Sequence, residues 1–436
     1  MDINTESYPV FKSKKTLQPC GEDSSVLGVE QAVYNVNLPA LMSLYRTPET
    51  IGFSCEGEEY YFHVSQVSRL DDVMRAQKKK NITVTLILLN SPYLFDSMKE
   101  KALLDICIHP DFSWEDPDVF ISAFPYFTEG RRYYQAFVEF LAKRYAGTDS
   151  NLSCVRGLIV SNEINSQYIW GNAGNKTPEE YVQEYEKILR LTAKASRKYY
   201  QNMRVYVSLD HLFNISLDPS LPLRYYQGRK VLELINEYAK REGNFDWSVA
   251  YHCYPENLYY PDFYNDRSAE FYFSTPRITF KNIEMLPAFL RQDRFLYQGR
   301  PRHIVLSEQG FHAEDNCFSE DQGAAAYALA YKKIEALTDI DMFMYHSYID
   351  NEKEFGLHLG IRRIGDEGKP GKPRKIYYCM KAMGTDEESF WVSWARDFIG
   401  HELFDRLMHP VIHLEEKADE SLNFGSRASD ITERNG

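Results

Sequence analysis

Two glutamates in this sequence each come directly after a short apolar run. Glu163 ends the stretch "LIVSNE" and Glu308 ends the stretch "HIVLSE". Such runs are typical of strands buried on both faces of a parallel sheet, where ligands bind at the carboxyl ends of the strands. Two carboxyl groups at one such edge can divide the work of bond cleavage. One protonates a leaving oxygen while the other attacks carbon or activates water, which is the chemistry that cleaves glycosidic bonds.

The dipeptide Asn162-Glu163 is not informative by itself. The same pair occurs at Asn236-Glu237, within residues of helical spacing, and at Asn351-Glu352, within a charged loop. Only Asn162-Glu163 follows a predicted strand. The prediction of chemistry therefore depends on where the strands lie.

Apolar runs alternate with helical patterns along the chain, as expected of β-α repeats and a parallel sheet. The eight predicted strands span residues 31–38, 82–90, 118–125, 156–163, 204–211, 247–254, 302–309 and 341–348. Eight such repeats close into a (β/α)8 barrel of the triosephosphate isomerase (TIM) type, with Glu163 ending the fourth strand and Glu308 the seventh. A doubly wound open sheet is the alternative fold. Its dinucleotide-binding form needs a G-x-G-x-x-G motif after the first strand, and the sequence has none there.

The predicted organisation has three parts: an N-terminal extension over residues 1–25, the barrel over 26–414 and a polar tail over 415–436. Two insertions are expected in the barrel. Residues 51–67, after the first predicted strand, have the pattern of a hairpin turning at Gly57. Residues 257–280, after the sixth, form a long loop rich in Tyr, Phe and Pro, which we expect to form one wall of a cleft.

Asn-Glu at the end of strand four and a second Glu at the end of strand seven resemble clan A of the glycoside hydrolases, barrel enzymes that retain anomeric configuration. The resemblance covers residues 26–400 and includes an uncharacterised bacterial branch of the superfamily, which leaves the substrate open. It implies hydrolysis of a β-linked glycan by double displacement. Glu163 would be the acid/base, Glu308 the nucleophile, and Asn162 the partner of the sugar 2-hydroxyl.

The sequence departs from this superfamily at two strand ends. Many members have Trp at the end of strand eight, whereas this chain has "MYHSYID", and the strand-six residue near the nucleophile is left open by "YHCYPENLYY". The alternative role is a salt bridge at the rim for each glutamate, a turn-forming role for Asn162 and a satisfied rim position for His211, and it is plain packing for the other candidates. The predicted substrate-binding residues besides Asn162 are Trp170, His211, His252, Tyr254, Tyr345 and His346.

Composition limits the possible partners. The chain has 436 residues, 44% of them hydrophobic, and a net charge of -13, which argues against nucleic acid and favours neutral or cationic ligands. The resemblance to glycoside hydrolases implies an oligosaccharide or polysaccharide substrate. It lacks an apolar run long enough to span a membrane and lacks a secretory signal, so a cytoplasmic location is expected unless a signal was removed. Seven cysteines without C-x-x-C spacing indicate free thiols and a reducing compartment. The oligomeric state is left open.

Three other kinds of chemistry are disfavoured, and no metal or other cofactor is expected. The first predicted strand lacks the His-x-His pair typical of metal-dependent hydrolysis, the eight strands lack a lysine for Schiff-base formation, and only Gly310 follows strand seven where a phosphate site would need a glycine-rich loop. The remaining rival is a barrel that binds carbohydrate without cleaving it.

Overall fold

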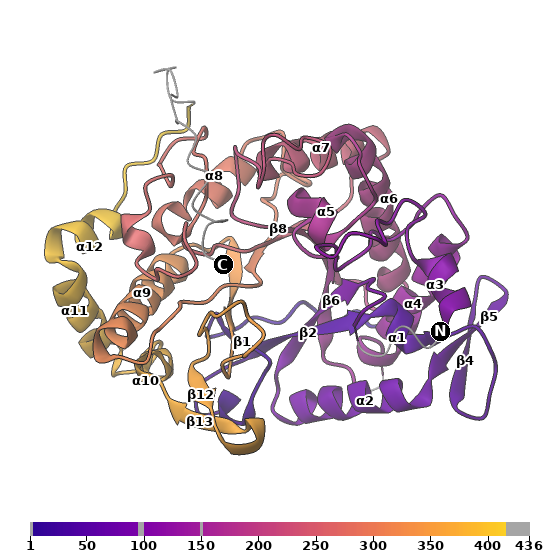
Figure 1. Cartoon of the computed structure of the whole chain (residues 1–436), viewed down its shortest axis with the longest axis horizontal. Coiled ribbons are helices and arrows are strands. Elements are labelled where there is room, and N and C mark those ends of the chain that lie inside the picture. The colour runs from indigo at the N-terminus through magenta and orange to yellow at the C-terminus, as the bar shows by residue number, and fades with distance from the viewer. Residues whose placement is uncertain (1–2, 95–99, 149–150, 416–436) are drawn as a thin grey trace.

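The computed structural model describes residues 3–94, 100–148 and 151–415, which form a closed barrel of eight parallel strands with helices around it (Figure 1). Each strand pairs with two neighbours, so the wall has no free edge. The barrel strands, in their order around the wall, are β1 (Lys15–Gln18), β2 (Gln31–Asn37), β6 (Thr83–Leu89), β7 (Val155–Val160), β8 (Arg204–Leu209), β9 (Ser248–Tyr251), β10 (Ile304–Leu306) and β11 (Ile340–His346).

One predicted strand is wrong, and one strand was missed. Residues 118–125 form no strand of the wall, because β6 pairs directly with β7 from Val84 to Leu88. Their apolar residue Ile121 instead joins the cluster inside the barrel. The missed strand is β1, which fills the gap between β11 and β2. The predicted extension over residues 1–25 therefore supplies part of the barrel, and its "KTLQ" has no apolar run to reveal it.

The two errors cancel in the strand count. Counting from β1, β7 is the fourth strand of the barrel and β10 is the seventh. Glu163 and Glu308 thus follow the strands that the sequence predicted, although the strands counted before them differ.

Helices cover the outside of the barrel (Figure 1). The longest, α6, begins with a capping box in which Thr177 and Glu180 satisfy each other's backbone N–H groups, and Pro178 occupies its first position. The α-helices are α1 (Leu38–Leu41), α2 (Val64–Lys79), α3 (Lys101–Cys107), α4 (Gly130–Tyr145), α5 (Gln167–Trp170), α6 (Pro178–Arg197), α7 (Gly228–Arg241), α8 (Met285–Leu290), α9 (Cys317–Glu335), α10 (Lys375–Ala382), α11 (Glu388–Ile399) and α12 (His401–Met408).

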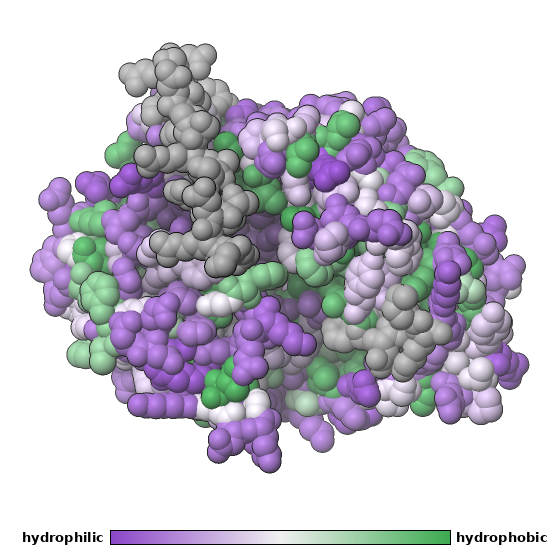
Figure 2. Space-filling model, viewed as in Figure 1, coloured by the Kyte–Doolittle hydropathy of each residue, from purple (hydrophilic) through white to green (hydrophobic). Residues whose placement is uncertain are grey.

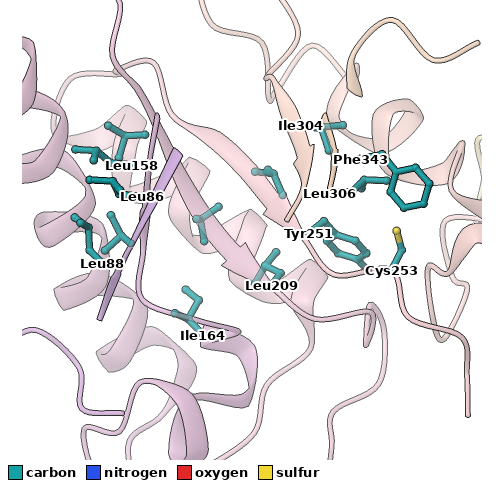
Figure 3. Packing of buried hydrophobic residues seen from close by; sticks show 14 of the residues in the cluster. Leu86, Leu88, Leu158, Ile164, Leu209, Tyr251, Cys253, Ile304, Leu306 and Phe343 are labelled. Carbon is teal, nitrogen blue, oxygen red and sulfur yellow. The ribbon is translucent and has the colours of Figure 1, made fainter. Parts of the chain in front are cut away.

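Side chains alternate between the two faces of the barrel wall, as the two-residue period of a strand requires. The interior cluster contains Val33, Ile87, Leu89, Ile121, Ile159, Tyr206, Ala250, Val305, Met342 and Met344. The residues between these positions point outward into the layer beneath the helices, including Leu86, Leu88, Leu158, Leu306 and Phe343 (Figure 3). The barrel is therefore a filled core, and chemistry is confined to its ends.

A hairpin and a long connection lie in the two regions where insertions were expected, and the hairpin ends before α2 begins at Val64. Strand β4 (Thr50–Cys55) pairs antiparallel with β5 (Glu58–His63) and turns at Gly57, and the short β3 (Met42–Ser43) pairs with β5 on its other side. After β9, residues 252–284 contain only the short 3-10 helices η4 (Phe263–Asn265) and η5 (Phe280–Asn282). A further hairpin, β12 (Arg362–Ile364) with β13 (Pro370–Pro373), follows β11.

The predicted polar tail falls almost wholly outside the described residues. Within them, no helix is both long and apolar enough to cross a membrane. All seven cysteines are free, with Cys317 exposed and Cys20 partly buried. The face in Figure 2 is mostly polar, with hydrophobic side chains in scattered patches.

The layer between wall and helices should dominate stability. Leu158 is fully buried there, so Leu158→Ala should lower the free energy of unfolding by about 2–5 kcal/mol through lost contacts and a cavity. Urea unfolding followed by circular dichroism measures this. Leu223→Ala, at a side chain that is 43% exposed, is the matched control, and equal losses in the two variants would contradict the assignment.

Candidate active site

Glu163 lies in a strained turn immediately after β7. Ser161 has φ +63° and Glu163 has φ +36°, and both therefore occupy the left-handed region that side chains with a Cβ atom disfavour. Such residues cost about 1–3 kcal/mol each and cluster at functional sites. The backbone N–H of Glu163 donates to Ser208 Oγ on β8 at 3.0 Å, which fixes the turn against the next strand.

Asp210, just past β8, holds the segment that follows this turn. Its carboxylate accepts hydrogen bonds from Asn165 Nδ2 at 2.6 Å, Ser166 Oγ at 2.6 Å and the Leu212 N–H at 2.7 Å. Burial, with the neighbouring charge of Glu163 adding to it, raises the pKa of Asp210 to about 6, although the hydrogen bonds to its carboxylate lower it. Asp210 is thus an anchoring residue of the rim whose acceptors are occupied by the chain itself.

The carboxyl group of Glu163 contacts the imidazole of His252, with 2.7 Å between Glu163 Oε1 and His252 Nδ1. The His252 side chain is only 1% exposed and that of Glu163 is 16% exposed. Burial raises the pKa of Glu163 to about 7 and lowers the pKa of His252. Glu163 can therefore keep its proton near neutral pH, as a general acid must.

Glu308 follows β10 by two residues and accepts a hydrogen bond from Tyr254, with 3.3 Å between Tyr254 Oη and Glu308 Oε1. Burial raises the pKa of Tyr254 well above its ordinary value, and the charges of Glu308 and Glu163 raise it further. The phenol therefore remains a donor. Since Tyr254 contacts Glu308 and His252, two residues earlier, contacts Glu163, the two glutamates lie in one region, around the residues that follow β9.

The alternation of β9 explains this convergence. Ala250 points into the barrel, and His252 and Tyr254 follow at the next two positions of the same period. Each of them contacts one glutamate. The sixth barrel strand thus contributes a pair of side chains between the acidic residues of strands four and seven.

His346, at the end of β11, forms an ion pair with Glu354, with 3.0 Å between Nε2 and Oε1. Burial lowers the pKa of His346, but its hydrogen bond to the Glu354 carboxylate and the charges of Glu308 and Glu354 outweigh burial, so the pKa is raised overall. The segment that carries Glu354 also packs Leu357 and Leu359 against Tyr254. The loop after strand eight therefore holds the His346 imidazole in place and favours its protonated form.

The position of Tyr345 differs from the prediction that this residue binds the substrate. It is fully buried, and its hydroxyl accepts a hydrogen bond from the Phe311 N–H at 3.1 Å. Met342 and Met344 face the interior, so Tyr345 between Met344 and His346 points outward against Tyr327 beneath the helices. Tyr345 cannot contact a substrate at the barrel mouth, whereas His346 lies on the inner face.

The remaining predicted residues lie around Glu163. His211 is half-buried, and burial, with the charges of Arg277 and His252 adding to it, lowers its pKa to about 3. Trp170 packs against the interior cluster and stacks on Phe120, with ring centroids 5.5 Å apart. Asn162 is half-buried between the two strained residues.

Sequence reasoning missed three residues of this region: Ser208, Phe120 and Glu354. Ser208 is one of the inward positions of β8, so the strand period could have found it. Glu354 lies in a charged loop whose contact with His346 depends on the fold. Among residues 3–94, 100–148 and 151–415, no group of three or more His, Cys, Asp or Glu side chains is arranged to hold a metal ion.

Glycosidases are among the solved structures that share this architecture. A family 39 glycoside hydrolase from Bacteroides cellulosilyticus WH2 matches with a TM-score of 0.52 and 11% identity over 88% of this chain and 66% of that one, so the match spans less than two thirds of that enzyme. A β-glucosidase from Pyrococcus furiosus matches with a TM-score of 0.52 and 13% identity over 86% of this chain and 85% of that one. This likeness shows that the chain has the same (β/α)8 barrel fold as these two glycosidases.

The sequence itself matches one family model. It belongs to DUF5722, a family of unknown function, whose model matches residues 7–407. No curated protein matches this chain. The match covers the whole barrel, from before β1 through α11.

Proposed function

We propose that this protein is a retaining glycoside hydrolase that cleaves a β-linked glycan, with Glu163 as acid/base and Glu308 as nucleophile. The observation that carries the proposal is the unequal setting of the two glutamates around the end of β9. Burial raises the pKa of Glu163 to about 7, beside His252, while Glu308 accepts a hydrogen bond from a phenol. One group is thereby kept as an acid, and the other has a donor for its charged form.

In the first step, a Glu308 oxygen forms a bond to the anomeric carbon as the bond from that carbon to the leaving oxygen breaks. The leaving oxygen takes its proton from Glu163. His252 orients the Glu163 carboxyl group through Oε1, and Tyr254 orients Glu308. The products are a glycosyl ester on Glu308, an ionised Glu163 and the departed alcohol or sugar.

In the second step, ionised Glu163 takes a proton from water, whose oxygen bonds to the anomeric carbon while the ester bond to Glu308 breaks. Two inversions give net retention. Glu163 is again protonated and Glu308 again ionised, so the enzyme returns to its starting state.

Proton NMR of the first product tests this proposal. Aryl β-glycosides and β-linked oligosaccharides of glucose, xylose, mannose and galactose provide the substrates. We expect the β anomer to appear first and to mutarotate afterwards. Initial release of the α anomer would indicate inversion. Binding of these glycans without release of product would favour the rival, a carbohydrate-binding barrel that does not cleave.

The raised pKa of Glu163 sets the basic limb of the pH profile. Because the acid must be protonated in the free enzyme, kcat/KM should be highest below pH 7 and fall about tenfold per pH unit above about pH 7. Rates measured between about pH 5 and pH 9 on a substrate with a poor leaving group report this limb. Glu163→Gln should remove this fall in kcat/KM above pH 7. An unchanged fall in that variant would show that another group titrates there.

A further inference from the structure

Large aromatic side chains remain exposed on the loops that follow β6 and β7. Tyr93, Trp114 and Phe120 are 48%, 43% and 40% exposed, and Trp170 is half-buried beside them. We call these four residues the aromatic wall. Contiguous exposed apolar surface is uncommon on soluble proteins and marks binding sites, because covering it with a ligand releases ordered water.

Contacts among these residues hold the wall in one arrangement. The rings of Phe120 and Trp170 stack with centroids 5.5 Å apart and planes 22° apart, and Tyr93 meets Trp114 edge to face with centroids 6.5 Å apart. Ser91 joins the two pairs. Its hydroxyl donates to the Phe120 carbonyl at 2.6 Å and accepts from the Tyr93 N–H at 3.2 Å. A ligand therefore meets preformed surfaces, and little ordering is needed on binding.

The wall is joined to the turn that carries Glu163. The N–H groups of Phe120 and Ile121 both donate to the Ile169 carbonyl, at 3.1 Å and 3.2 Å. The hydroxyl of Ser161, two residues before Glu163, donates to the Trp170 carbonyl at 3.2 Å. Because β8 and β9 separate β7 from β10 in the barrel, the wall lies on the side of Glu163 that is away from the strand preceding Glu308.

We infer that the aromatic wall binds the leaving-group portion of an oligosaccharide, so that the substrate extends beyond the cleaved bond by at least one sugar unit. This inference rests on the proposed function, because it takes Glu163 as the acid. An acid protonates the leaving oxygen, so the sugar units attached to that oxygen lie on the acid's side. Pyranose rings with equatorial substituents present flat C–H faces that pack on aromatic rings while their hydroxyls stay hydrated.

Binding to an inactive full-length chain tests the inference without depending on catalysis. We would measure by calorimetry the affinity of Glu308→Gln for cellohexaose, xylohexaose, mannohexaose and laminarihexaose. Trp170→Ala and Phe120→Ala would each be added to that background. We expect the best hexasaccharide to bind about 3- to 10-fold more weakly in either double variant, as loss of one aromatic contact implies. Phe390→Ala, at a ring that is 67% exposed on α11 at the far left of Figure 1, is the matched control.

Kinetics of the active chain give the second measurement. Trp170→Ala and Phe120→Ala should lower kcat/KM more on the hexasaccharide than on an aryl glycoside of the same sugar, by about 3- to 10-fold, and Trp170→Phe should restore part of the loss. Trp170 supports the interior cluster, so the more exposed Phe120 keeps the test valid if Trp170→Ala misfolds.

The outcomes separate this inference from the proposed function. Unchanged affinity in both wall variants, or no binding of any hexasaccharide, would overturn the inference even if aryl glycosides are hydrolysed. Wall-dependent binding without hydrolysis of any substrate would leave the wall as a glycan site and overturn the proposed catalysis. It would also remove the reason for assigning the leaving-group side.

Discussion

Glu308→Gln is expected to lower kcat/KM by about 10⁴- to 10⁶-fold, the scale of losing a nucleophile. The amide is nearly the same size as the carboxylate but cannot form the glycosyl ester. The Tyr254 hydroxyl that donates to Glu308 can still donate to the amide oxygen. The change should therefore remove chemistry while leaving the fold and glycan binding intact, and initial rates on an aryl β-glycoside measure it.

Glu237→Gln is a matched control for this substitution. Glu237 belongs to the Asn236-Glu237 pair on α7 and is exposed, so its amide should leave the rate unchanged. A 2-deoxy-2-fluoro-β-glycoside, whose ester hydrolyses slowly, should in addition label the native chain, and peptide mass spectrometry should place the label on Glu308. A label on another residue, or a rate within tenfold of native for Glu308→Gln, would reject Glu308 as the nucleophile.

The barrel was predictable because most of its strands are long apolar runs between helical patterns. The pattern of apolar residues could not distinguish a segment that forms a strand of the wall from one that caps the barrel mouth. Ile121 is buried in the interior cluster without belonging to a strand, while Lys15 in β1 is buried although its residue type predicts exposure. Lys15 donates to the Leu27 carbonyl at 2.9 Å, a contact between segments that local sequence does not encode.

In the candidate site, too, some positions could be predicted from the sequence and others depend on contacts between distant segments. Both glutamates, His252 and His346 could be placed from the sequence, because each lies at or just past a strand end. The two-residue period of β11 could also have rejected Tyr345, since it lies between Met344 and His346 on the opposite face. In contrast, the ion pair of His346 with Glu354 joins β11 to a loop eight residues later, and only the folded chain brings them together.

The strained turn at Glu163 was outside the reach of sequence patterns as well. Strand alternation stops at Val160, and left-handed conformations at Ser161 and Glu163 redirect the chain. Neither residue type favours that conformation, so no sequence pattern indicated the strained turn. The hydrogen bonds to Ser208 and Asp210 hold the turn, so β8 and the segment after it help to offset the cost of the strained residues.

The effect of Glu163→Gln should depend on the leaving group, and this dependence separates an acid catalyst from a structural carboxylate. For an alkyl or sugar leaving group, loss of the proton donor should lower kcat/KM by about 10²- to 10⁴-fold. For a 2,4-dinitrophenyl leaving group, which departs without a proton, kcat/KM should stay close to native. Initial rates on a series of aryl and alkyl β-glycosides of one sugar measure both effects.

The second step gives the same substitution an independent signature. Without the base, water attacks the ester on Glu308 slowly, so the glycosyl-enzyme accumulates and kcat falls even for the activated substrate. Azide, which needs no base, should restore kcat and yield the β-glycosyl azide. A variant that merely disturbed the contact of Glu163 with His252 would lose kcat/KM equally on every leaving group and would gain nothing from azide. That pattern would leave Glu163 as a positioning residue and reject its role as the acid.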